Sequence, residues 1–157
     1  MTAVAPDAII HGTHAFDGGF LADTEDLKEQ ILTLSGQDGI TFSGGEPFLQ
    51  VEACLDIARF CNDHDLNIWC YTGFTFEQLL NFKDENILKF LKTLDVLIDG
   101  PFIEEQKDLD LNFRGSQNQR LLDVKKSLKQ KRAVKLKESQ EPYLQSEIFL
   151  KSCYMFI

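Results

Sequence analysis

The sequence has few cysteines, and none of them is spaced for a disulfide framework or a C-x-x-C metal site. The four are Cys54, Cys61, Cys70 and Cys153. So few cysteines, without disulfide spacing, are typical of proteins in a reducing compartment. Free cysteines in such proteins are mostly buried in the core, so we expect these four to be buried structural thiols. The histidines, His11, His14 and His64, form no H-x-x-x-H spacing, so surface or capping roles are expected for them.

Long apolar runs and an excess of basic residues are also missing. No stretch reaches the roughly 18 consecutive apolar residues of a membrane span, and the first ten residues do not resemble a signal peptide. Sixteen Lys and Arg against 25 Asp and Glu give a net charge of -9, which argues against binding nucleic acid through its phosphates. We therefore expect a cytoplasmic protein that binds neither membranes nor nucleic acid.

Helical and strand patterns alternate along the 157 residues, which suffice for one core. Apolar stripes and capping residues predict helices over 24–34, over 51–61 and, intermittently, over 75–91. Continuous β-rich runs predict buried strands. These strands are expected at 39–43, 67–72 and 95–99, with a last short one around 133–136. The order favours an α/β fold with a parallel sheet, whose ligand groups lie at the carboxyl ends of the strands.

The strongest local motif follows the first of these strands and contains Ser43, Gly44, Gly45, Glu46 and Pro47. It lacks the residues of a dinucleotide-binding or phosphate-binding loop. Paired glycines allow close approach of the backbone to a ligand, and a carboxylate beside them can accept a hydrogen bond from an ammonium group. The motif therefore predicts a pocket for the amino-acid part of a ligand. The alternative is a tight turn with a solvated glutamate.

Two further segments carry polar groups beyond the strands. Asp99 ends the third strand, and a glycine-containing loop brings Arg114, Ser116 and Asn118 into an otherwise acidic chain. This loop would suit an anion or another polar ligand. Alternatively, it is structural, with its arginines neutralising nearby carboxylates. A basic cluster over 125–137 is interpreted as a solvated helix end, the alternative being a surface for a partner.

The order of five motifs resembles the radical S-adenosylmethionine activating enzymes, in particular the activating proteins of anaerobic ribonucleoside-triphosphate reductases. The motifs are FDGG (16–19), TFSGGEPFLQ (41–50), IWCYTG (68–73), DVLIDGPF (95–102) and FRGSQNQR (113–120). The resemblance implies a partial parallel (β/α) barrel with S-adenosylmethionine and a 4Fe-4S cluster. These generate a radical on a glycine of the partner reductase, a glycyl-radical enzyme. The expected cofactor-binding residues are Ser43, Gly44, Gly45, Glu46, Pro47, Thr72, Asp99, Arg114, Ser116 and Asn118.

The chain departs from this family where the cluster ligands belong. The family's C-x-x-x-C-x-x-C motif is absent, and its three positions fall on Met1, Ala5 and Ala8. Neither alanine nor a methionine thioether replaces a cluster thiolate, so no cluster is expected. The first barrel strand is missing as well, which predicts an exposed sheet edge and either low solubility or a required partner. We divide the chain into an incomplete radical S-adenosylmethionine domain (1–136) and a divergent tail (137–157).

Two functions follow from these observations. The chain is predicted to be an activating protein that keeps the cofactor-binding half but is inactive alone because the cluster cysteines are absent. The alternative is a binding module or regulatory subunit that works without redox chemistry, or a truncated gene product.

Overall fold

The computed structural model describes residues 22–34 and 36–136, together with the backbone of 153–156. Met1, Ala5 and Ala8 lie outside this part, as does most of the tail. The elements, in chain order, are α1 (Thr24–Thr33), β1 (Gly39–Ser43), the 3-10 turn η2 (Pro47–Leu49), α2 (Val51–Asp63), β2 (Asn67–Tyr71), α3 (Phe76–Asn81), α4 (Glu85–Thr93), β3 (Val96–Asp99), the 3-10 turn η3 (Glu104–Gln106), β4 (Arg120–Asp123), α5 (Val124–Gln130) and β5 (Cys153–Phe156).

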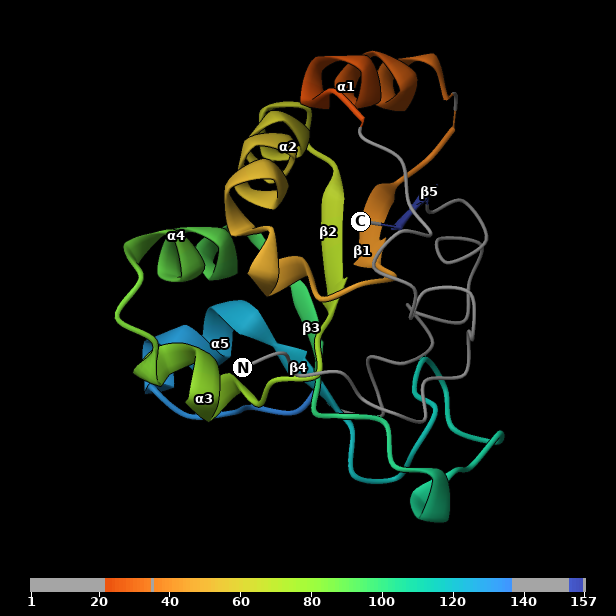
Figure 1. Ribbon diagram of the computed structural model, residues 1–157, viewed down its shortest axis with the longest axis vertical. Coiled ribbons are helices and arrows are strands. Elements are labelled where there is room, and N and C mark those ends of the chain that lie inside the picture. Colours follow the sequence, from red (N-terminus) through yellow and green to blue (C-terminus); the bar gives the residue numbers. More distant parts are fainter. Residues whose placement is uncertain (1–21, 35, 137–152, 157) are drawn as a thin grey trace.

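The predicted α/β architecture is confirmed, with one five-stranded sheet in the order β4-β3-β2-β1-β5 (Figure 1). The pairs β1–β2, β2–β3 and β1–β5 are parallel, and β3–β4 is antiparallel. The antiparallel β4 was not predicted, because Arg120 is the last residue of the preceding motif and 121–123 were assigned to no element. The helical region over 75–91 is divided into α3 and α4, and the strand expected at 133–136 forms only a bridge between Leu122 and Lys135.

The expectation of an exposed edge on β1 is wrong. β5 pairs in parallel with that edge, and Ile40 to Ser43 stand opposite Cys153 to Phe156. β1 is therefore an inner strand, and β5 takes its place at the edge of the sheet. The tail at 153–156 therefore has a structural role that its sequence did not reveal.

The two faces of the sheet carry cores of different size. Side chains alternate along each strand, so Ile40, Phe42 and Leu97 point to the face that the helices cover. Figure 1 shows α2, α4 and α5 on this side. Phe90 of α4 packs edge-on against Phe42, with ring centroids 5.3 Å apart. The opposite face carries a smaller cluster of Trp69, Val96, Ile98 and Leu121.

The predicted structural role is confirmed for three of the four thiols and for one histidine, while the side chain of Cys153 lies outside the described residues. Cys54, Cys61 and Cys70 are buried in the larger core. His64 is the C-cap of α2. Within the described part of the chain, none of the helices is long and apolar enough to span a membrane.

Candidate functional site at the carboxyl ends of the strands

Glu46 joins the loops that follow β1 and β2. It is the N-cap of η2, where one carboxylate oxygen, Oε1, accepts a hydrogen bond from the Phe48 N–H (3.2 Å). The same oxygen accepts one from the Thr72 hydroxyl (2.8 Å), and Oε2 accepts one from the Gly73 N–H (2.8 Å). The sequence placed Glu46 and Thr72 at neighbouring strand ends, and the structure brings them into direct contact.

Burial makes the charged form of Glu46 costly. Desolvation raises the pKa of its carboxyl group, and the three hydrogen bonds offset only part of that rise. All three donors are neutral groups. Within the residues that the structure describes, Glu46 forms no ion pair with a lysine, arginine or histidine. A carboxylate in this state is stabilised by any cation that reaches it.

Asp99 has the opposite surroundings. It is fully buried at the end of β3, and its carboxylate accepts hydrogen bonds from the Phe76 N–H (2.7 Å) and from the forked guanidinium of Arg120. Arg120 also pairs with Glu77 (2.7 Å), which lowers the pKa of the Glu77 carboxyl. The negative charge of Asp99 is therefore already compensated by Arg120. A cofactor-binding role for Asp99 stays a prediction.

The loop over 113–119 is held by its own side chains. The buried Ser116 hydroxyl donates to the Asn118 side chain (2.7 Å) and accepts from the Ile103 N–H (3.2 Å). Asn118 in turn donates to the Pro101 carbonyl (2.7 Å). These contacts support the structural interpretation for Ser116 and Asn118. Arg114 differs, because within the described residues it forms no ion pair and its Nε donates only to the Asn112 carbonyl (3.4 Å).

The remaining predicted residues surround Glu46 in the chain. Gly44 has φ of 105°, a conformation that favours glycine, and it turns the chain out of β1. Gly45 is exposed and Ser43 partly buried, whereas Pro47 is buried and belongs to η2. Behind them, the Gly100 N–H donates to the Phe74 carbonyl (3.0 Å), which ties the loop after β3 to the loop after β2. The candidate site is this joined set of strand ends.

Sequence reasoning missed three members of this region. The Gly73 N–H, Glu77 and the pairing of Arg120 with Asp99 are all established by contacts between distant parts of the chain. In the sequence, Arg120 is the last residue of the FRGSQNQR motif, and no local pattern indicates its partner. Its position opposite Asp99 follows from the β3–β4 register, which depends on a strand that the sequence pattern did not indicate.

The described cysteines do not fit an iron–sulfur cluster. Cluster ligands are thiolates, and burial raises the pKa of the Cys54 thiol to about 12 and that of Cys70 well above its usual value. Cys54 donates to the Pro47 carbonyl (3.4 Å), and Cys70 lies inside β2. Among the residues described, no group of three His, Cys, Asp or Glu side chains could hold a metal ion.

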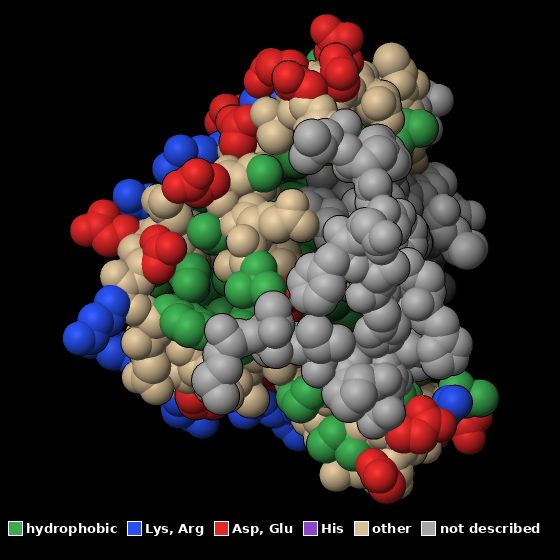
Figure 2. Space-filling view, in the orientation of Figure 1, with side chains coloured by type: hydrophobic (Ala, Val, Ile, Leu, Met, Phe, Trp, Pro, Cys, Tyr) green, Lys and Arg blue, Asp and Glu red, His purple; other side chains and the backbone are tan. Residues whose placement is uncertain are grey.

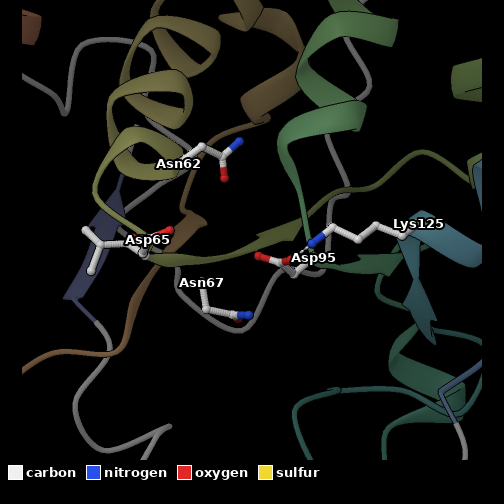
Figure 3. Close-up of a pocket in the computed structure, with 6 residues that line it drawn as sticks. Asn62, Asp65, Asn67, Asp95 and Lys125 are labelled. Atoms are coloured by element: carbon white, nitrogen blue, oxygen red, sulfur yellow. Dashed lines mark hydrogen bonds and ion pairs between the residues drawn. The ribbon is translucent and has the colours of Figure 1, made fainter.

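The opposite, amino end of the sheet carries a polar hollow of about 240 Å³ (Figure 3). Asp95 lies at its wall, where one oxygen pairs with Lys125 (2.6 Å) and the other accepts the Ile68 N–H (2.9 Å). Asn62, Asp65, Leu66 and Asn67 complete the lining. Because ligands of open parallel sheets bind at the carboxyl ends of the strands, we do not place the functional site here.

Comparison with known proteins agrees with the motifs. Residues 9–122 match a family model described as a 4Fe-4S single cluster domain. The chain is 39% identical over 116 residues to the anaerobic ribonucleoside-triphosphate reductase-activating protein of Haemophilus influenzae, covering 67% of this chain and 70% of the relative. For the proteins of the same name from Vibrio cholerae and bacteriophage T4, identity is 35% over 107 residues and 32% over 109. These matches cover 61% and 66% of this chain and 65% of each relative.

Proposed function

The chain belongs to the family of anaerobic ribonucleoside-triphosphate reductase-activating proteins, and from that premise we propose that it binds S-adenosylmethionine at the carboxyl ends of β1 and β2. The ammonium group of the methionine part is assigned to Glu46. The loop residues Ser43 to Pro47, together with Thr72, form the surroundings of that group. The relatives are named for their action on the reductase, and we assign the same partner to this chain.

One observation carries this proposal: Glu46 is a desolvated carboxylate whose three protein donors are all neutral. Asp99, the fully buried carboxylate at these strand ends, already has Arg120. A cationic ligand group is therefore stabilised at Glu46 and gains little at Asp99. When bound beside a four-iron cluster, S-adenosylmethionine supplies the glycyl-radical chemistry of the family.

We further propose that these 157 residues alone do not make a radical. The described cysteines are buried thiols in the core, and the resemblance places the family's cluster motif on Met1, Ala5 and Ala8. We infer a partial radical S-adenosylmethionine barrel that retains the cofactor pocket. Without cluster ligands, the chain would have the second candidate function, that of a module that binds cofactor and reductase without redox chemistry.

The pocket is tested by titrating the protein with S-adenosylmethionine in a calorimeter. Glu46→Gln keeps the size of the side chain and removes its charge, so we expect binding to weaken by roughly 10- to 100-fold, the range for a hydrogen bond to a charged group. Glu52→Gln, on the exposed face of α2, is the matched control and should bind as the parent does. Equal affinity of the parent and Glu46→Gln would remove Glu46 from the site.

Iron separates the two candidate functions. After anaerobic reconstitution, we expect almost no iron or acid-labile sulfide bound to the purified chain. Close to four irons per chain, with a visible spectrum that changes when S-adenosylmethionine is added, would contradict the loss of the cluster and make the protein a candidate radical enzyme.

A further inference from the structure

One fully buried carboxylate lies behind the Glu46 site. In Figure 2 the acidic side chains of the visible face lie mainly at its margins, with a group of them over α1. Asp99 differs from these, because its side chain has no exposed surface. A buried charge is costly unless it is paired and hydrogen-bonded, so its partners are an essential part of the fold. Because Asp99 offers no surface to a ligand, it affects the site only through the groups that it contacts.

Asp99 holds the loop that carries two of the Glu46 donors. We call residues 72–76 the donor loop, because its first two residues donate to the Glu46 carboxylate. At the other end of the loop, the Phe76 N–H donates to Asp99 Oδ2 (2.7 Å). Phe76 is the first residue of α3, so its N–H has no partner within the helix. The donor loop is therefore held between two carboxylates, Glu46 at its start and Asp99 at its end.

Two backbone hydrogen bonds also connect the donor loop to β3 and to the residue after it. The Thr72 N–H donates to the Ile98 carbonyl (3.0 Å), and the Gly100 N–H donates to the Phe74 carbonyl (3.0 Å). Both bonds join main-chain groups, whereas the bond to Asp99 has a side-chain acceptor. A substitution of Asp99 can therefore release the end of the donor loop while the two backbone bonds remain.

Arg120 fixes the orientation of the Asp99 carboxylate. Its Nε donates to Oδ1 (2.9 Å) and its Nη2 donates to Oδ2, so one planar fork holds both oxygens. The same guanidinium binds both carboxylate oxygens of Glu77, the residue after Phe76. The first turn of α3 is thus fixed at two successive residues. The pair of Asp99 and Arg120 therefore determines where the donor loop ends.

We propose that Asp99 and Arg120 are positioning residues, which hold the donor loop so that its donors stay on Glu46. This inference rests on the proposed function, in which Glu46 binds the ammonium group of the cofactor. A loop that is fixed before the ligand arrives needs no ordering during binding, and such ordering costs free energy. Without the pair, the loop must be ordered as the ligand binds, so the affinity falls.

The test separates positioning from stability. Asp99→Leu with Arg120→Met, the apolar-pair variant, replaces a buried ion pair by apolar side chains, a change that is often neutral for folding. It removes the acceptor of the Phe76 N–H, so the affinity for S-adenosylmethionine in the calorimeter should fall by about five- to tenfold, the cost of ordering one or two groups. In the ligand-free protein, the Gly73 amide should exchange faster. The Asp95 amide, hydrogen-bonded at the amino end of the sheet, should keep its rate.

Two further variants complete the test. Asp95→Leu with Lys125→Met removes a carboxylate and its cation at the amino end, and should change neither the affinity nor the exchange of the Gly73 amide. Asp99→Asn loses the charge and should be less stable than the parent. It keeps an oxygen for the Phe76 N–H, because two donors converge on Oδ2 and one on Oδ1. Asp99→Asn should therefore retain more affinity than the apolar-pair variant.

The outcomes distinguish failure of the positioning role from failure of the proposed function. If the parent does not bind S-adenosylmethionine, the proposed function fails. Exchange of the Gly73 amide then decides the positioning role, which faster exchange in the apolar-pair variant supports and unchanged exchange overturns. If the parent and the apolar-pair variant bind equally well, the positioning role fails and the proposed function stands.

Two other results also decide the positioning role. If affinity follows stability, with Asp99→Asn binding more weakly than the apolar-pair variant, the ion pair only stabilises the fold and the positioning role is overturned. If the apolar-pair variant does not fold, Arg120→Lys takes its place, because lysine keeps the charge without the planar fork. Faster exchange of the Gly73 amide, with the Asp95 amide unchanged, would support the positioning role in that variant, and equal rates at Gly73 would overturn it.

Discussion

The two ends of the parallel sheet use carboxylates in different ways. At the amino end, Asp95 links β3 to β2 and is paired with Lys125, whose side chain is 74% exposed. At the carboxyl end, Glu46 links two loops with neutral donors only, and desolvation raises the pKa of its carboxyl group. The amino end is thus electrostatically complete, whereas the carboxyl end retains a charge that a ligand can compensate. The difference shows where a cationic ligand gains most.

The largest expected effect comes from removing the cation at the carboxyl end. Arg120→Met leaves the fully buried Asp99 without its partner, and we expect the free energy of unfolding to fall by about 3–5 kcal/mol, the cost typical of an unpaired buried charge. Urea denaturation measures this change. The matched variant at the amino end, Lys125→Met, removes an exposed partner and should cost less than about 1 kcal/mol. Equal losses of unfolding free energy in the two variants would mean that the ion pairs at the two ends of the sheet contribute equally to stability.

Alanine in place of one glycine at each end should sharpen the comparison. A Cβ on Gly39, at the start of β1, would lie 2.1 Å from the Asn67 carbonyl oxygen, so backbone must move. We expect Gly39→Ala to cost about 3 kcal/mol, at the upper end of the range for overpacking. A Cβ on Gly73 would lie 3.5 Å from Glu46 Oε2, which is an ordinary contact, and Gly73→Ala should cost less than about 1 kcal/mol. Thermal melting of both variants tests this, with the larger loss of stability expected at Gly39, at the amino end of the sheet.

The pairing of β5 with β1 predicts a smaller effect with a built-in control. The Asp38 carbonyl, just before β1, accepts a hydrogen bond from the Asn67 N–H of β2. Because backbone groups alternate sides along a strand, the N–H and C=O of Thr41 point away from β2 and toward β5. With Thr41 opposite Tyr154, the N–H of Met155 is directed toward β1 and that of Tyr154 is directed away. Met155→Pro should therefore lower stability by about 1 kcal/mol, the net value of one hydrogen bond, and Tyr154→Pro should cost less.

Hydrogen exchange of the β1 amides reports this pairing directly. In Met155→Pro, the amides of Thr41 and Ser43 should exchange faster, while those of Ile40 and Phe42, which face β2, stay protected. Unchanged protection of Thr41 and Ser43 would mean that β5 does not cover this edge in solution.

The smallest expected effect is on the pH dependence of stability. The pKa of the Glu46 carboxyl is raised in the folded state, so the folded protein holds its proton more tightly than the unfolded chain does. Stability from this group is therefore present below the unfolded pKa and declines as pH rises through the folded pKa. Glu46→Gln should flatten that decline in a series of urea titrations. An identical pH profile for the parent would show that Glu46 is not desolvated.

Local patterns predicted much of the fold because helix caps, apolar stripes and strand runs act within a few residues. Thr75 and Gln78 form a capping box where the helical region over 75–91 was predicted to begin, and the contact between Glu46 and Thr72 follows from their places at the ends of neighbouring strands. The rest depends on distant pairing. The antiparallel β4 and the tail strand β5 gain their stability from pairing with β3 and β1. Each has only four residues, too few for a sequence pattern to predict a strand.

The titration of Glu46 by carbon-13 NMR, with and without S-adenosylmethionine, tests the central claim most directly. We expect the free protein to show a pKa for this carboxyl group above its ordinary value, and the bound ammonium group to lower it. A pKa that is ordinary in the free protein, or that does not fall when the cofactor binds, would contradict the assignment of Glu46 as the uncompensated charge of the site.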